Sequence, residues 1–111
     1  MNRKEYMKMY NEKYTRTIKG LVKKIYAHQI RNTKHRGHEL PKYTEEELYN
    51  WFIAENSKSC IYENWVNSNY DKELIPSIDR LINTETYSID NIQLVTWKRN
   101  KEFLRIGRVF K

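Results

Sequence analysis

The sequence predicts an α+β fold in which several helices precede a strand, a turn, a second strand and a last helix. Before Pro76 the apolar residues follow helical spacing, and the 111 residues include only three glycines and two prolines. After Pro76 the apolar pattern alternates, as is typical of short strands. A mean hydropathy of −0.95 favours disorder. An aromatic content of 14% nevertheless predicts a small folded core.

Two helices are expected in the first part of the chain. Residues 3–14 are charged and lack a clear apolar stripe, so we expect a frayed helix or a tail that contacts DNA. An amphipathic helix should begin at Thr15 or Thr17 and end at Arg31. A polar loop with glycine and proline should then cover residues 32–41.

The middle of the chain should form two further helices. A capping box at Thr44 and Glu47 predicts the start of the first. Its expected buried residues are Leu48, Trp51 and Phe52. The second should follow a cap at Ser57 or Ser59, and Cys60 is expected to be a small core residue in it. Its expected inward-facing residues are Ile61, Trp65 and Val66, and the helix should end between Asn67 and Tyr70.

The last third of the chain should contain the strands. We predict a strand over residues 78–82, a turn over 83–87 and a strand over 92–95. Thr96 should cap the final helix. The apolar residues of that helix are Trp97, Phe103 and Leu104, and Trp97 should share a core with Trp51, Phe52 and Trp65.

The chain has a net charge of +7, and its charged residues are distributed unevenly along the sequence. Residues 1–43 hold 12 basic and 3 acidic side chains, residues 44–75 hold 2 and 7, and residues 76–111 hold 7 and 4. We expect one compact domain with a basic helical DNA-binding arm, a helical support segment and a C-terminal unit with these bounds. A solvated basic helix, or an amphipathic helix at a membrane surface, would account for part of this pattern.

Several classes of protein are excluded by simple counts. No run approaches the roughly 20 apolar residues of a membrane span, and the first residues lack the apolar stretch of a secretory signal. The single cysteine excludes a disulfide framework and a zinc site built only from cysteines. We therefore expect a cytoplasmic protein without a membrane partner.

The most informative stretch, residues 76–100, reads PSIDRLINTETYSIDNIQLVTWKRN and covers about a quarter of the chain. It resembles the HNH nucleases, whose ββα-metal motif cuts nucleic acid, and is closest to small phage HNH homing-endonuclease-like proteins. The resemblance implies that Asp79 and Asn100 hold a divalent metal and that Asn91, nine residues before Asn100, positions the site. One carboxylate and one amide oxygen suit Mg²⁺ or Mn²⁺. Taken singly, Asp79 or Asn91 would be read as an ordinary turn residue.

Arg80 departs from the HNH pattern because it stands where the family has a histidine general base. A guanidinium cannot be deprotonated in a protein, so Arg80 would instead clamp a phosphate or stabilise the transition state. The base would then be His35, His38, Tyr87 or a metal-bound hydroxide. Loss of hydrolysis is the other possibility. The chain also lacks the cysteine pairs with which many HNH domains bind a structural zinc.

The resemblance predicts a metal-dependent endonuclease that acts on double-stranded DNA, in the host cytoplasm if a phage encodes it. Its site would comprise Asp79, Arg80, Asn91 and Asn100, and no small-molecule cofactor is expected. The predicted DNA contacts are Lys23, Lys24, Arg31, Lys34, His35, Arg36, Lys98, Arg99 and Lys101. Double-strand cleavage would imply a homodimer or two successive events. The alternatives are a non-catalytic DNA-binding protein that retains the scaffold, and an interaction protein that uses its acidic middle segment.

Overall fold

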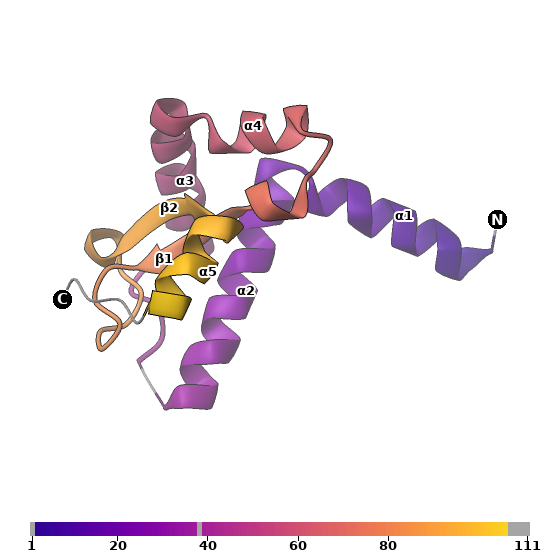
Figure 1. Cartoon of the computed structure of the whole chain (residues 1–111). Coiled ribbons are helices and arrows are strands. Elements are labelled where there is room, and N and C mark those ends of the chain that lie inside the picture. Colours follow the sequence, from indigo (N-terminus) through magenta and orange to yellow (C-terminus); the bar gives the residue numbers. More distant parts are fainter. Residues whose placement is uncertain (1, 38, 107–111) are drawn as a thin grey trace.

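A computed structural model describes residues 2–37 and 39–106 of the chain, and the predicted α+β class is confirmed (Figure 1). Within these residues the helices are α1 (Arg3–Thr15), α2 (Ile18–Arg36), α3 (Glu45–Ser59), α4 (Ile61–Asn67) and α5 (Trp97–Ile106). Two antiparallel strands, β1 (Pro76–Arg80) and β2 (Ile92–Thr96), form the sheet. Short 3₁₀ turns, η1 (Lys72–Leu74) and η2 (Ile89–Asn91), precede the two strands.

The N-terminal helix α1 extends away from the rest of the molecule (Figure 1). Asn2 caps it, because the Asn2 side chain accepts a hydrogen bond from the amide of Glu5 at 2.8 Å. None of residues 3–15 is buried, which agrees with the missing apolar stripe. Thr17 caps α2 by accepting from the amide of Gly20 at 3.0 Å, so of the two predicted starts the one at Thr17 is confirmed.

Helix α2 is longer than its sequence predicts. It ends at Arg36 instead of Arg31, and Gly37 closes it in the left-handed conformation with φ 71°. The expected loop over residues 32–41 is therefore wrong for its first half. Packing explains the difference, because Thr33 is buried on this last part of the helix and its hydroxyl donates to the carbonyl of Ile30 at 2.9 Å. Tertiary contact here outweighs the weak helix propensity of asparagine and threonine.

The boundary between α3 and α4 corrects two expectations. The capping box that begins α3 is confirmed, with both reciprocal bonds between Thr44 and Glu47 present. However, Cys60 is exposed with φ 58°, so the prediction of a helical core cysteine is wrong. Cys60 is the residue at which one helix ends and the next begins. The predicted cap at Ser57 or Ser59 is also wrong, because both serines lie within α3 and α4 has no side-chain cap. Asn56 links the two helices by accepting from the amide of Tyr62 at 2.8 Å.

The sheet has a regular register from Pro76 opposite Thr96 to Arg80 opposite Ile92. The predicted strand over residues 78–82 is therefore misplaced by two residues, and both Leu81 and Ile82 are exposed in the following turn. The reason is that the side chain of Asn91 pairs with the peptide groups of Ile82 and so removes that residue from the ladder.

The hydrophobic core lies between the sheet and helices α2, α3 and α4. Its buried members are Leu21, Val22, Tyr43, Leu48, Phe52, Trp65, Ile78 and Ile92. Phe52 and Trp65 are core residues as predicted, whereas Trp51 and Trp97 are only partly buried. Phe103 and Leu104 lie on α5, but their side chains are not described. None of the helices in the described part of the chain is long and apolar enough to cross a membrane.

Candidate metal and nucleic-acid site

Successive side chains of β1 point to opposite faces of the two-stranded sheet. Ile78 faces the core, so Arg80 shares that face, while Ser77 and Asp79 point to the other. Asp79 is only 4% exposed and lies opposite Gln93, whose amide nitrogen is 3.5 Å from one carboxylate oxygen. The predicted metal ligand is thus a largely buried carboxylate on the outer face.

Asn100 reaches the same outer face from α5. Its Nδ2 donates to the hydroxyl of Ser77 at 3.0 Å, two residues before Asp79 on β1. Its Oδ1 is buried and has no hydrogen-bond partner among the described residues. The first turn of α5 is fixed nearby, because the amide of Trp97 donates to the carbonyl of Ile75 at 2.8 Å. The predicted cap at Thr96 is confirmed by its bond from the amide of Arg99 at 3.2 Å.

Asn91 holds the turn between the two strands. Its Oδ1 accepts from the amide of Ile82 at 2.7 Å, and its Nδ2 donates at 3.0 Å to the carbonyls of both Ile82 and Thr86. The residue is 4% exposed, so these bonds are shielded from water. Its observed contacts are therefore with the backbone that connects β1 to β2.

Arg80 braces the same turn. Its guanidinium donates to the carbonyl of Glu85 at 3.1 Å and lies 5.2 Å from the centre of the Tyr87 ring. Only 8% of the residue is exposed. Little of this guanidinium is therefore accessible to a phosphate. These contacts therefore favour a structural use of Arg80 over the phosphate clamp that the sequence suggests.

The predicted candidates for a general base come from different segments of the chain. His35 is exposed on α2, and His38 lies outside the described residues. Tyr87 is partly buried beside Arg80, and its carbonyl accepts from the amide of Lys42 at 2.9 Å. The chain that follows α2 therefore packs directly against the turn between the strands.

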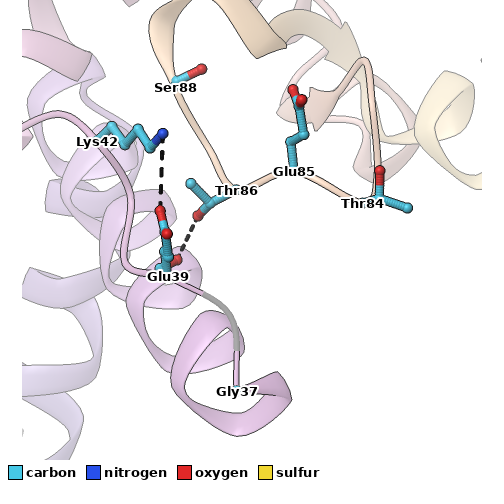
Figure 2. Close-up of a pocket in the computed structure, with 7 residues that line it drawn as sticks. All are labelled: Gly37, Glu39, Lys42, Thr84, Glu85, Thr86 and Ser88. Atoms are coloured by element: carbon cyan, nitrogen blue, oxygen red, sulfur yellow. Dashed lines mark hydrogen bonds and ion pairs between the residues drawn. The ribbon is translucent and has the colours of Figure 1, made fainter.

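A cleft of about 490 Å³ opens where the chain that follows α2 meets the turn between β1 and β2 (Figure 2). Figure 2 shows Thr86 and Lys42 both reaching Glu39, with the Thr86 hydroxyl donating to its carbonyl at 2.5 Å and Lys42 3.9 Å from its carboxylate. Glu85 lines the same cleft. Two carboxylates against one lysine make this cleft a poor site for a phosphate.

A second cleft, of about 420 Å³, lies between α2 on one side and β1, η1 and α5 on the other. Asn100 and Ser77 line it, together with Lys24, His28 and Gln29 from α2. His28 and Gln29 were not predicted as site residues from the sequence. The helical period relates His28 and Gln29 to Lys24, but no local signal says that this face of α2 meets α5.

The predicted DNA-binding residues form two exposed groups. On α2, Lys23, Lys24, Arg31, Lys34 and His35 are exposed, whereas the side chain of Arg36 is not described. On α5, Lys98 and Arg99 are exposed. Two of the α5 cations have acidic partners, since Lys101 is 2.9 Å from Glu73 and Arg99 is 3.5 Å from Glu102. Such exposed pairs are weak, so these cations could still meet a phosphate.

Two further observations bear on the metal and on the family. No three histidine, cysteine or acidic side chains gather closely enough to hold a metal ion in residues 2–37 and 39–106. Mg²⁺ usually keeps several waters in proteins, so a cation at Asp79 and Asn100 could complete its coordination with water or phosphate. No family model matches the chain, and no match is found among curated proteins or solved structures. Membership of the HNH family accordingly stays a prediction from residues 76–100.

Proposed function

We propose that this protein binds double-stranded DNA and hydrolyses a phosphodiester bond with one divalent cation, Mg²⁺ or Mn²⁺, held by Asp79 and Asn100. The observation that carries the proposal is the buried Oδ1 of Asn100, which lacks a partner among the described residues. Leaving a buried acceptor unpaired costs about 1–3 kcal/mol, so such atoms call for an explanation. A hard cation beside the carboxylate of Asp79 would provide one.

The remaining parts of the site have separate roles in this proposal. The cation would neutralise charge that develops on the phosphate. Ser77 orients the amide of Asn100, and Asn91 fixes the turn that follows Asp79. The exposed cations of α2 and α5 would hold the DNA backbone. Arg80 stays protonated, so another group must accept the proton of the attacking water.

A plasmid-nicking assay with Mg²⁺ or Mn²⁺ tests the proposal. Asp79→Ala and Asn100→Ala should each lower the nicking rate by about 100-fold or more, since a catalytic cation supplies several kcal/mol. Asp90→Ala is the matched control, because Asp90 is exposed in η2 and outside the site. Calorimetric titration with Mn²⁺ should show binding that Asp79→Ala removes. A wild type that nicks nothing, or an Asp79→Ala variant as active as wild type, would refute the proposal.

A second candidate function is favoured by the contacts of Arg80. A buried arginine that braces the turn, at the position of the base, fits a DNA-binding protein that has lost hydrolysis. This protein would bind DNA without added metal, and log K would fall with log salt by about 0.9 for each phosphate contacted. Cleavage gained by Arg80→His would support this alternative.

A further inference from the structure

The cleft between α2 and α5 has mainly apolar and aromatic walls. Helix α2 contributes Leu21 and Ile25, and the opposite wall comes from residues 75–78, Tyr87 and Trp97. Its volume of about 420 Å³ lies in the range of small-molecule sites. Walls of this kind suit a flat, weakly polar ring system, which aromatic side chains can stack against.

Gln29 gives this cleft a specific polar group. The residue is 3% exposed, and its Oε1 accepts from the hydroxyl of Tyr43 at 2.7 Å. Its Nε2 is buried and has no hydrogen-bond partner among the described residues. Burial raises the pKa of the Tyr43 hydroxyl, which therefore keeps the proton that it donates to Gln29. Gln29 thus has a donor left for an acceptor on a ligand.

The rim of the cleft is basic. Lys24 and His28 are exposed on α2, and Lys72 faces them from η1. None of the described residues that line the cleft is acidic. The rim therefore favours an anionic group next to the apolar walls.

We propose that this cleft binds a single nucleotide that has left the base stack of DNA. The base would lie between the apolar and aromatic walls, with a ring nitrogen or carbonyl accepting from Nε2 of Gln29, and the phosphate would meet Lys24 and Lys72. Proteins that hold an extruded base combine stacking and edge contacts in this way. The inference rests on the proposed DNA binding. A free mononucleotide presents the same chemistry, so the experiment separates the two sources.

The test measures affinity for a short duplex with one unpaired adenine and for the fully paired duplex of the same sequence. Wild type should bind the first about tenfold more tightly, the range expected for stacking one base. Lys24→Ala should reduce this preference, whereas Lys23→Ala should weaken both duplexes equally, because Lys23 does not line the cleft. Equal affinity for the two duplexes, or equal effects of the two lysine variants, would overturn the inference.

Gln29→Met and a mononucleotide titration complete the design. Gln29→Met removes the donor and should abolish the preference for the unpaired base. If Gln29→Met does not fold, the comparison of Lys24→Ala with Lys23→Ala tests the inference without it. Deoxyadenosine monophosphate should bind more weakly than the unpaired duplex but more tightly than inorganic phosphate. Binding of phosphate as tight as that of the nucleotide would refute a base site. If the protein nicks DNA but binds both duplexes with equal affinity, the nucleotide site in the cleft is refuted and the proposed function still stands.

Discussion

Asn91→Ala should destabilise the protein, because the buried side chain of Asn91 holds the turn between the two strands. Apart from a long contact of 3.5 Å to the carbonyl of Glu85, the side chain makes one bond of 2.7 Å to the amide of Ile82 and two of 3.0 Å to the carbonyls of Ile82 and Thr86. Each bond contributes about 1 kcal/mol net, and the backbone groups left behind are shielded from water. We therefore expect a loss of about 3 kcal/mol in the free energy of unfolding. For a chain of this size, that loss lowers Tm by on the order of 10 °C.

Urea unfolding followed by circular dichroism measures this loss. Asn91→Asp keeps the acceptor for Ile82 but places negative charge against two carbonyl oxygens, so it should destabilise at least as much at neutral pH. Asn64→Ala is the control, since Asn64 is exposed on α4 and alanine favours helix. Its effect should be near zero. A loss below about 1 kcal/mol for Asn91→Ala would show that water replaces the three bonds and would refute the reasoning.

Four other substitutions test local features of the fold by the same unfolding experiment. Thr44→Ala should cost about 1 kcal/mol because it removes the capping box of α3. Above pH 10 the unfolded tyrosine loses its proton while the buried Tyr43 keeps it, so stability should fall as pH rises, and Tyr43→Phe should flatten that slope. Gly20→Ala should cost about 2 kcal/mol or more, since its Cβ would meet the carbonyl oxygen of Tyr14 at 2.0 Å. Gly37→Ala meets no atom, and its φ of +71° should cost about 1 kcal/mol. An equal cost for both glycine variants would contradict the clash.

Features specified by neighbouring residues were predictable from the sequence. The capping box depends on Thr44 and Glu47 alone, and the alternation after Pro76 identified a strand because the opposing faces of a sheet differ in polarity. The end of α2 was not predictable, because nothing in the polar sequence around Thr33 indicates that this residue is buried. Cys60 was misread for a related reason. Its positive φ occurs at the junction where α3 ends and α4 begins, and cysteine has no preference for that conformation.

The candidate site also has one part that could be predicted from the sequence and one part that could not. The spacing of Asp79, Asn91 and Asn100 predicted residues of one structural unit, and Asn100 indeed contacts the strand that carries Asp79. The cleft beside Asn100 could not be predicted from the sequence, because its other wall is α2, which lies about 70 residues before Asn100 in the chain. His28 and Gln29 looked like ordinary helix residues until packing placed them opposite Asn100. Their role depends on tertiary structure alone.

Arg80 and Asn91 converge on one backbone atom, and this connects stability with the candidate chemistry. Both side chains donate to the carbonyl of Glu85, at 3.1 Å and 3.5 Å. They hold the turn from different elements, immediately after the strand that carries Asp79. A substitution of either residue will therefore displace the turn as well as remove its own functional group. Arg80→His illustrates the consequence. The substitution supplies a titratable group but loses the bond to the carbonyl of Glu85. If this variant does not nick DNA, the result counts against a general base at position 80 only when an unfolding measurement shows that the turn is intact.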